Sequence, residues 1–200
     1  HINFSRIAFR AILAPLLMTL SLYFLLKGFR NGKFLNFVLS GTFLGLGLHT
    51  YISFRIVPLI FAIALLLFLI DRIRRREFKG YLSAVSVFLL FAIVSALPMA
   101  IYFYQNPDDF MGRTGQVSIF DAEEPALELA KSTLLHLGMF NFYGDPNWRH
   151  NYSTHPMLPL PVGILFLIGL AIFIKRSFDS ARRRDYGKLA VYSSIPAWFF

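Results

Sequence analysis

Long apolar runs alternate with short clusters of charged residues along the chain. Five of the runs are long enough, or nearly so, to cross the roughly 30 Å hydrocarbon core of a bilayer as helices. They cover residues 11–26, 34–52, 56–70, 81–104 and 158–174, and a sixth run begins near Leu189. The charged clusters fall between these runs, as expected for membrane spans joined by loops. The pattern predicts an all-α polytopic membrane protein.

The composition supports this class and excludes others. Of the 200 residues, 56% are apolar and only 16% are charged, whereas about a quarter of a soluble domain is charged. The net charge of +9 does not indicate a nucleic-acid partner, because the basic residues flank the apolar runs, where membrane topology accounts for them. The chain has no Cys, which excludes disulfides and cysteine metal sites.

The basic residues predict the orientation in the membrane. Three loops, after the first, third and fifth runs, carry 14 of the 20 basic residues. The positive-inside rule puts these loops in the cytoplasm of a multi-pass protein of the plasma or inner membrane. The N-terminal stretch, the turn at 53–55 and the loop 105–157 are then extracytoplasmic. We expect three parts: spans one to four in 1–104, the loop 105–157, and span five with the start of a sixth in 158–200.

Residues 34–70 allow two interpretations. A single helix would be about 55 Å long, nearly twice the hydrocarbon core, and would put two basic loops on opposite sides. Two spans that turn at 53–55 fit better. The first of them carries Gly41 and Gly45 at GxxxG spacing, with Gly47 following, and this spacing favours close packing against another helix.

The loop 105–157 has 53 residues, too many for a simple connection, and holds seven of the eleven acidic residues. One helix is predicted in it, capped by Asp121 or Ser118, with Pro125 in its first turn. Its apolar side chains share one face: Leu127, Ala130, Leu134 and Leu137. Such a helix lies flat at the outer membrane surface or packs on the spans; both alternatives stay open.

Polar and aromatic residues concentrate just before the fifth span. Asp145, Arg149 and His150 lie in a stretch too rich in Gly, Pro and Asn to be a span, so we expect them at the mouth of the helix bundle, able to bind a ligand. The alternative is structural: Asp145 and Arg149 pair, and Trp148 anchors the loop at the interface. His136, His150 and His155 have poor spacing for a metal, so a divalent cation is not supported.

A second group of polar residues lies at the same, extracytoplasmic, ends of the other spans. Arg6 precedes the first span, and His49, Tyr51 and Arg55 lie at the turn between the second and third. Arginines near helix ends are often snorkelling anchors. Together with Arg149, however, Arg6 and Arg55 suggest a site for an anion, and a phosphate at the membrane surface suits guanidinium groups, which bind it in two-point fashion.

These residues carry a resemblance to a known family. HINFSR at 1–6 resembles the H-x-x-F-S-R stretch that precedes a span in glycosyltransferase family 39, a group related to dolichyl-phosphate-mannose protein mannosyltransferases and aminoarabinose transferases. GLGLHTYISFR at 45–55, followed by Pro58, is similar to the family's GLGLYTYxxFR hairpin, with His49 where the family often has Tyr. GDPNWRHN at 144–151 and PML at 156–158 resemble its GDxNxRHN…PML segment.

The resemblance implies a GT-C type helical bundle that transfers a hexose from a polyprenyl-phosphate donor to a hydroxyl of a protein or glycan acceptor on the outer face of the membrane. The chemistry that it implies needs groups that hold the departing lipid phosphate, a need that Arg6, Arg55, Arg149 and His150 could meet. The candidate residues for binding the substrate or its lipid phosphate are Arg6, His49, Tyr51, Arg55, Asp145, Arg149 and His150. The family's catalytic acidic residue lies in the first outside loop, which would precede His1. Because the chain opens with His1 and stops at Phe200 inside an apolar run, we expect a longer protein and assign no catalytic base and no cofactor.

Three alternatives remain, one of which is a purely structural membrane subunit. A lipid-linked saccharide ligase or polymerase would use a pyrophosphate donor instead. A transporter or flippase would carry ionisable residues in the middle of its spans, and here the span interiors are nearly free of charge.

Overall fold

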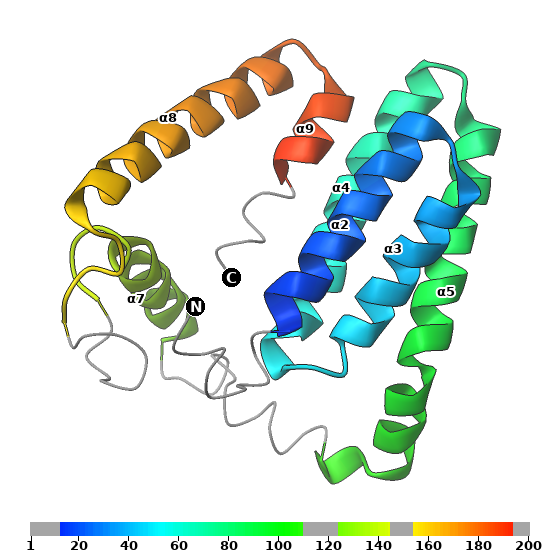
Figure 1. Ribbon diagram of the computed structural model, residues 1–200, viewed down its shortest axis with the longest axis horizontal. Helices are drawn as coiled ribbons and strands as arrows, with labels where there is room; N and C mark the ends of the chain where they lie inside the picture. Colours follow the sequence, from blue (N-terminus) through cyan, green and yellow to red (C-terminus); the bar gives the residue numbers. More distant parts are fainter. Residues whose placement is uncertain (1–12, 110–123, 145–153, 194–200) are drawn as a thin grey trace. The chain divides into compact units, whose positions relative to one another are not determined.

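The computed structural model describes residues 13–109, 124–144 and 154–193; residues 1–12, 110–123, 145–153 and 194–200 lie outside this description. Within the described ranges every regular element is a helix (Figure 1). The chain divides into two units, His1–Pro107 with Ser177–Phe200, and Asp108–Arg176. Each unit is considered by itself.

Four helical stretches are long and apolar enough to cross a membrane. They contain α2 (Leu13–Asn31), α4 (Val57–Arg74), α5 (Phe78–Gln105) and α8 (Leu160–Arg182). The predicted apolar helices at 11–26, 56–70, 81–104 and 158–174 are therefore confirmed. Three of them, α2, α4 and α8, run past the predicted C-terminal boundary into the basic clusters. Lys and Arg are good helix formers and interact favourably with the C-terminal end of the helix dipole, which explains the extension.

The second predicted span is shorter than expected. The pattern predicts a span over 34–52, but α3 covers only Phe34–Gly47, about 21 Å at 1.5 Å per residue. The predicted break before the next span is confirmed, yet it begins at Leu48 and not at Ser53, which lies in the 3₁₀ helix η2 (Ile52–Ile56). The cause is tertiary: the ring of Phe54 folds back onto Gly47, where any Cβ would overlap the ring.

The GxxxG spacing of α3 brings this helix against the backbone of α5. A Cβ added at Gly41 would overlap the carbonyl oxygen of Phe88 and lie 3.0 Å from the amide nitrogen of Ala92. A Cβ at Gly45 would lie 2.6 Å from Cβ of Ser95. The predicted close packing is thus confirmed, because the missing side chains let the two backbones touch.

A pair of serines joins α2 to α3. Ser21 Oγ donates to the carbonyl of Ser40 at 2.8 Å, and Ser40 Oγ donates to the carbonyl of Ser21 at 2.7 Å. Both side chains are fully buried. The two hydroxyls therefore satisfy each other inside an otherwise apolar interface formed by Met18, Leu22, Leu25 and Phe37.

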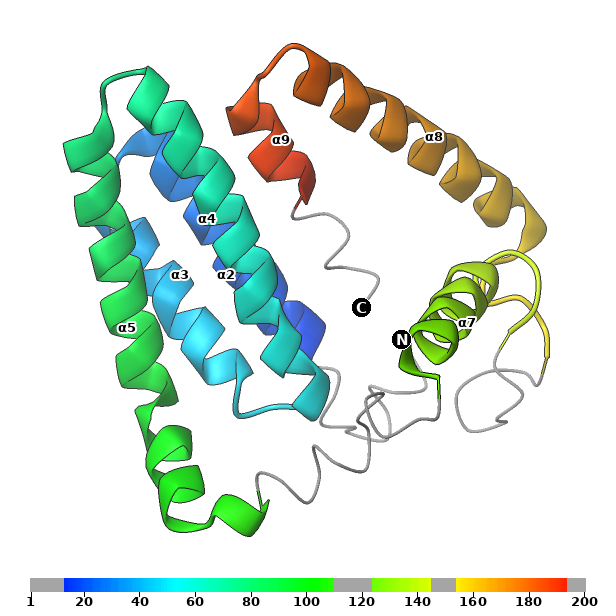
Figure 2. The same ribbon diagram turned by 180° about the vertical axis from the view of Figure 1, so that it is seen from behind.

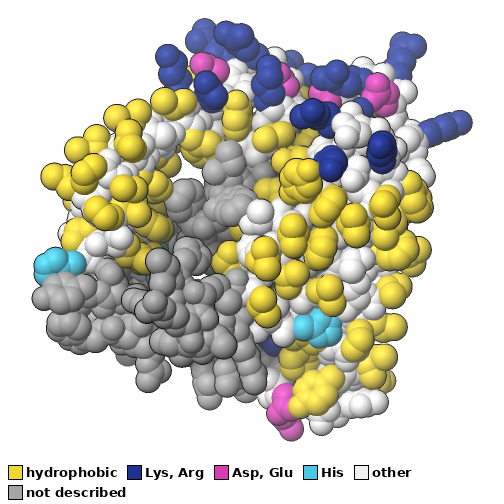
Figure 3. All heavy atoms as spheres, viewed as in Figure 1, with side chains coloured by type: hydrophobic (Ala, Val, Ile, Leu, Met, Phe, Trp, Pro, Cys, Tyr) yellow, Lys and Arg dark blue, Asp and Glu magenta, His cyan; other side chains and the backbone are white. Residues whose placement is uncertain are grey.

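The basic connections of the first unit meet at one end of its helices. Arg72 donates to the carbonyl of Phe29 at 3.1 Å, which joins the C-terminal turn of α4 to that of α2. Arg74 donates to the carbonyl of Arg184 at 3.4 Å, just before α9 (Tyr186–Ser193). In Figures 1 and 2 the α2–α3 and α4–α5 connections lie at the same end, and Figure 3 shows Lys and Arg gathered there above the apolar sides of α2, α3 and α5.

The run predicted to open a sixth span begins as α9, three residues before Leu189, and its described part packs on α4. The guanidinium of Arg74 lies 4.6 Å from the ring centroid of Tyr186, and Ala190 is fully buried. Asp185 precedes α9 and accepts a hydrogen bond from the backbone N–H of Lys188 at 3.1 Å, which caps the helix. Residues from 194 onward lie outside the description.

The second unit contains the helix predicted in the long loop, α7 (Pro125–Gly138). Its N-cap is Glu124, without a side-chain capping bond, so the helix begins later than a cap at Asp121 or Ser118 would require; those two residues lie outside the described ranges. Pro125 occupies the first turn as expected. No residue of α7 is buried, and the predicted apolar face, with Leu127 60% and Leu134 70% exposed, is uncovered by the described residues.

Candidate lipid-phosphate site at the turn between α3 and α4

The described part of the candidate site is the turn that follows α3. The chain begins to reverse after α3. The amide of Leu48 donates to the carbonyl of Gly45, and the amide of His49 donates to the carbonyl of Leu46. Thr50 Oγ1 donates to the carbonyl of Gly47 at 2.6 Å and closes the turn. Tyr51 is then extended (φ −146°, ψ 149°) and caps η2. Three predicted site residues, His49, Tyr51 and Arg55, are therefore presented within one short segment.

His49 is held by the backbone of α5. Its Nε2 lies 2.9 Å from the carbonyl oxygen of Ser95, which can only accept, so Nε2 carries the hydrogen and donates. In the neutral imidazole this tautomer leaves Nδ1 as an acceptor. The side chain is exposed. His49 thus presents an oriented ring to its surroundings.

Arg55 is held by the end of α5. Its guanidinium carbon lies 5.1 Å from the ring centroid of Phe103, a cation–π contact, and the side chain is half-buried. Ser95 and Phe103 are eight residues apart, about 12 Å along the helix axis at 1.5 Å per residue. The contacts of His49 and Arg55 are therefore spread over two turns of α5, a span suited to a group larger than a lone phosphate.

This turn lies at the opposite end of α4 from the basic connections. α4 has 18 residues, about 27 Å at 1.5 Å per residue. Arg55 lies two residues before its start, and Arg72 and Arg74 occupy its last turn. Tyr51, 41% exposed, and Tyr102 and Tyr104 of α5 place aromatic side chains at this end. Tyr is enriched where a spanning helix meets the membrane interface.

The other predicted site residues are not described. Arg6, Asp145, Arg149 and His150 lie outside the described ranges, so their convergence with Arg55 stays a prediction. The structure does describe the stem of the loop that carries three of them. Gly144 N donates to the Thr154 carbonyl at 3.2 Å, Met157 N to Met139 at 3.0 Å and Leu158 N to Phe140 at 3.0 Å. These bonds join the described residues on the two sides of 145–153.

Two residues that hold the site were not identified from sequence. Ser95 acts through its backbone carbonyl, so no side-chain pattern could reveal it. Phe103 lies in the aromatic sequence Tyr102–Phe103–Tyr104, which an analysis of aromatic belts would have marked as interfacial. Among the described residues, no group of three or more His, Asp or Glu is arranged to hold a metal ion.

In the part of the chain that the structure describes, the regular elements are all helices, and four helical stretches are candidate membrane spans. Comparison with protein-family models, curated proteins and solved structures finds no match for the chain.

Proposed function

We propose that the protein is a membrane glycosyltransferase that moves a hexose from a polyprenyl-phosphate donor to a hydroxyl of a protein or glycan acceptor. The supporting observation is the turn between α3 and α4. The stretch 45–55, which resembles the hairpin of glycosyltransferase family 39, folds as a reversal that presents His49, Tyr51 and Arg55 together. They lie at the end of α4 that is remote from the basic connections.

Each residue has a role that its chemistry suits. The guanidinium of Arg55 binds the donor phosphate and stabilises the charge that develops as this phosphate departs. His49 and Tyr51 bind hydroxyls of the sugar, His49 through the Nδ1 acceptor that its bond to Ser95 leaves available. Arg6, Asp145, Arg149 and His150 complete the site. The base that takes the acceptor proton is assigned to none of these residues.

The proposed orientation follows from the charges. The connections that carry Lys33, Arg72 and Arg184 share one end of the first unit, and the positive-inside rule assigns this end to the cytoplasm. The turn at His49 and the loop 105–157 then face outward from the plasma or inner membrane. α7 is proposed to lie in the outer interface, with Leu127, Ala130, Leu134 and Leu137 in the lipid and Glu128 and His136 on the wet side. A GT-C type bundle accommodates this arrangement.

The burial pattern disfavours a transporter. Transport pathways usually place ionisable residues inside the spans. Among the described residues the buried polar side chains are Ser21, Asn36, Ser40 and Ser180, and none of these is charged. The described spans thus bury no charged side chain, which fits a transferase that acts at the membrane surface.

The test is sugar transfer from a labelled polyprenyl-phosphate-hexose in membranes that contain the full-length protein. Arg55→Ala should lower the rate by about tenfold to a hundredfold, the worth of charge-assisted hydrogen bonds of 1.5–3 kcal/mol. Arg55→Lys keeps the charge but lacks the planar guanidinium, so its rate should lie between those of the wild type and Arg55→Ala. Arg176→Ala, an exposed arginine near the end of α8, is the matched control.

Three outcomes contradict the proposal. One is a wild-type transfer rate in Arg55→Ala at equal expression. Another is a loss of transfer in Arg176→Ala as large as that in Arg55→Ala. The third is transfer only from a polyprenyl-pyrophosphate donor, which would instead identify a lipid-linked saccharide ligase or polymerase.

A further inference from the structure

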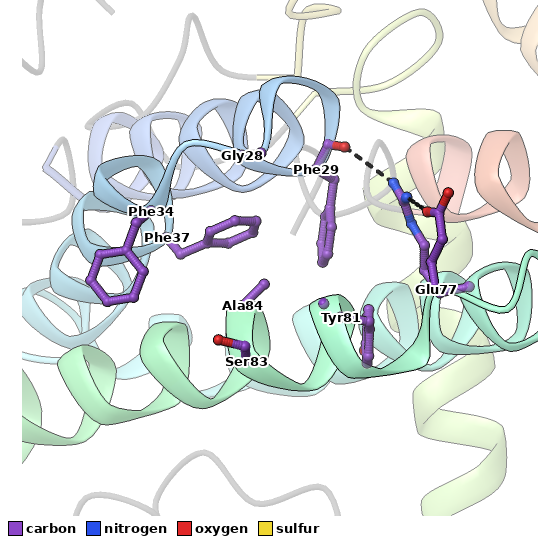
Figure 4. Close-up of a pocket in the computed structure, with 11 residues that line it drawn as sticks. Gly28, Phe29, Phe34, Phe37, Glu77, Tyr81, Ser83 and Ala84 are labelled. Carbon is purple, nitrogen blue, oxygen red and sulfur yellow. Dashed lines mark hydrogen bonds and ion pairs between the residues drawn. The ribbon is translucent and has the colours of Figure 1, made fainter.

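A cavity lies at the basic end of the first unit, away from the turn at His49. It has a volume of about 450 Å³, within the size range of small-molecule sites. Figure 4 shows its walls: Phe29 and Phe37 project from α2 and α3 toward α5, which contributes Tyr81, Ser83 and Ala84. We call this cavity the aromatic slot. Its lining is mainly apolar.

The walls of the slot are held in place by ring contacts. The rings of Phe29 and Tyr81 are stacked, with centroids 5.8 Å apart and planes 7° apart. Phe29 also meets Phe37 edge-on at 5.2 Å. The hydroxyl of Tyr81 donates to the carbonyl of Leu65 at 2.7 Å, which ties this wall to α4. The slot is therefore a preformed feature of four helices.

Glycines border the slot. A Cβ at Gly80, in the first turn of α5, would meet nothing within 4 Å, and the same holds at Gly32. Both glycines line the slot. From Gly80 to Ala84 the slot follows α5 for about one helical turn, roughly 6 Å. It thus leads from the charged end of the helices toward their apolar middle.

Cations flank the slot. Lys33 lies between the lining residues Gly32 and Phe34, and Lys79 precedes Gly80. Both lysines are exposed, and neither side chain has a partner among the described residues. Arg72 also lines the slot, and its ion pair with Glu77 neutralises the Glu77 carboxylate. The Nε of Arg72 is buried and has no hydrogen-bond partner in the described part of the chain. The surroundings of the slot therefore carry unbalanced positive charge beside an apolar cavity.

We propose that the aromatic slot binds one acyl chain of an anionic phospholipid, whose phosphate is held by Lys33 and Lys79. The occupant follows from position and charge. The slot opens where spanning helices end, which is the depth of lipid headgroups, and basic pockets between membrane helices suit anionic headgroups. The mainly apolar lining disfavours a free anion, and the two unpaired lysines disfavour a zwitterionic lipid. The site is separate from the turn at His49, at the opposite end of α4, and does not depend on the proposed transferase activity.

The test measures lipid binding by the full-length protein in detergent, by native mass spectrometry and by the shift of the melting temperature. The probes are dioleoylphosphatidylglycerol, dioleoylphosphatidylcholine and inorganic phosphate. Phosphatidylglycerol should remain bound and raise the melting temperature, because a ligand that binds only the folded state stabilises it. The other two probes should do neither at the same concentration.

Two variants separate the acyl-chain part of the site from the headgroup part. Gly80→Leu fills the slot and should abolish the shift, whereas Gly169→Leu, at an α8 glycine whose Cβ would also meet nothing within 4 Å, should keep it. The double variant Lys33→Gln, Lys79→Gln alters only exposed side chains. It should weaken binding roughly thirtyfold, at about 1 kcal/mol for each surface lysine. Lys175→Gln, an exposed lysine of α8, is its control.

The proposal is overturned if Gly80→Leu keeps the wild-type shift, or if phosphatidylcholine binds as tightly as phosphatidylglycerol. It is also overturned if inorganic phosphate alone reproduces the shift, since this would indicate an anion site without an acyl chain.

Discussion

Ser21 of α2 and Ser40 of α3 exchange hydrogen bonds across a buried interface, each hydroxyl donating to the backbone carbonyl of the other. Both carbonyls belong to helices, so they accept these bonds in addition to their place in the helical ladder. The arrangement lets two polar side chains sit among apolar residues without an unsatisfied group, and it defines the register of α2 against α3. A one-residue slide of either helix would break both bonds.

The serine pair predicts a small, measurable contribution to stability. Ser21→Ala and Ser40→Ala each remove one hydrogen bond and leave the other intact. Each should lower the free energy of unfolding by about 0.6 kcal/mol, the typical worth of such bonds inside membrane proteins, and the double variant by roughly the sum. Unfolding in mixed micelles titrated with a denaturing detergent measures this. Ser86→Ala, an exposed serine of α5, should be neutral; a loss there equal to that of Ser21→Ala would show that the buried pair contributes nothing specific.

The contact between α3 and α5 predicts a larger effect. Gly41→Ala places a methyl group against the Phe88 carbonyl, and Gly45→Ala places one against Ser95. The backbones must separate, which should lower the free energy of unfolding by about 1–3 kcal/mol in each case. Gly169→Ala adds its methyl group in open space and should be neutral or stabilising by up to about 1 kcal/mol, since Ala favours helix over Gly. The same detergent titration applies. Equal stability of the three variants would contradict the close packing.

Asp185 predicts a dependence of stability on pH. The pKa of Asp185 lies below its ordinary 3.8, mainly because the side chain of Lys188 donates a hydrogen bond to this carboxylate. A second hydrogen bond, from the backbone amide of Lys188, acts in the same direction. Since the pKa is lower in the folded than in the unfolded protein, the interaction stabilises the fold above about pH 4 and is lost as the pH falls through the folded-state pKa. Asp185→Asn should therefore lose less stability than the wild type when the pH drops below about 4.

Melting temperatures across this pH range provide the measurement. Asp179→Asn is the control, because the Asp179 carboxylate has no ion-pair partner among the described residues. If the melting temperatures of the wild type and Asp185→Asn changed with pH in the same way, the Asp185 carboxylate would not be the group responsible.

The orientation can be tested by labelling, which is simple here because these 200 residues include no Cys. Ser53→Cys, exposed in η2, should react in intact cells with a maleimide that does not cross membranes. Lys33→Cys, between α2 and α3, should react only after permeabilisation, if the basic connections are cytoplasmic. The opposite pattern would invert the proposed orientation, and labelling of both positions in intact cells would mean that α3 and its neighbours do not separate the two sides.

The apolar helices were predictable because their signal is local. A run such as 81–104 has too many consecutive apolar residues to be anything but a buried or membrane-spanning helix, and α5 follows it to within a few residues. The end of α3 was not predictable in the same way. Residues 48–52 remain apolar enough to continue a helix, and the chain turns there because Phe54 packs on Gly47, a contact that periodicity does not encode.

The candidate site also has a part that was predictable from sequence and a part that was not. Residue types alone marked His49 and Arg55 as unusual at the end of two apolar runs. Their supports, the carbonyl of Ser95 and the ring of Phe103, come from a helix more than 40 residues further along the chain. The aromatic slot had no sequence signal, since Phe29, Phe37 and Tyr81 read as ordinary apolar positions until three helices bring them together.

Composition and spacing were thus sufficient to predict that the described residues are helical, that four helical stretches are long and apolar enough to span a membrane, and that α3 carries a GxxxG contact surface. These properties depend on neighbours in the chain and on the solvent that each segment requires. Where α3 stops, how Ser21 meets Ser40, and which residues enclose a cavity depend instead on the fit between surfaces from distant segments. That fit is a property of the packed helices, so it appears only when they are assembled.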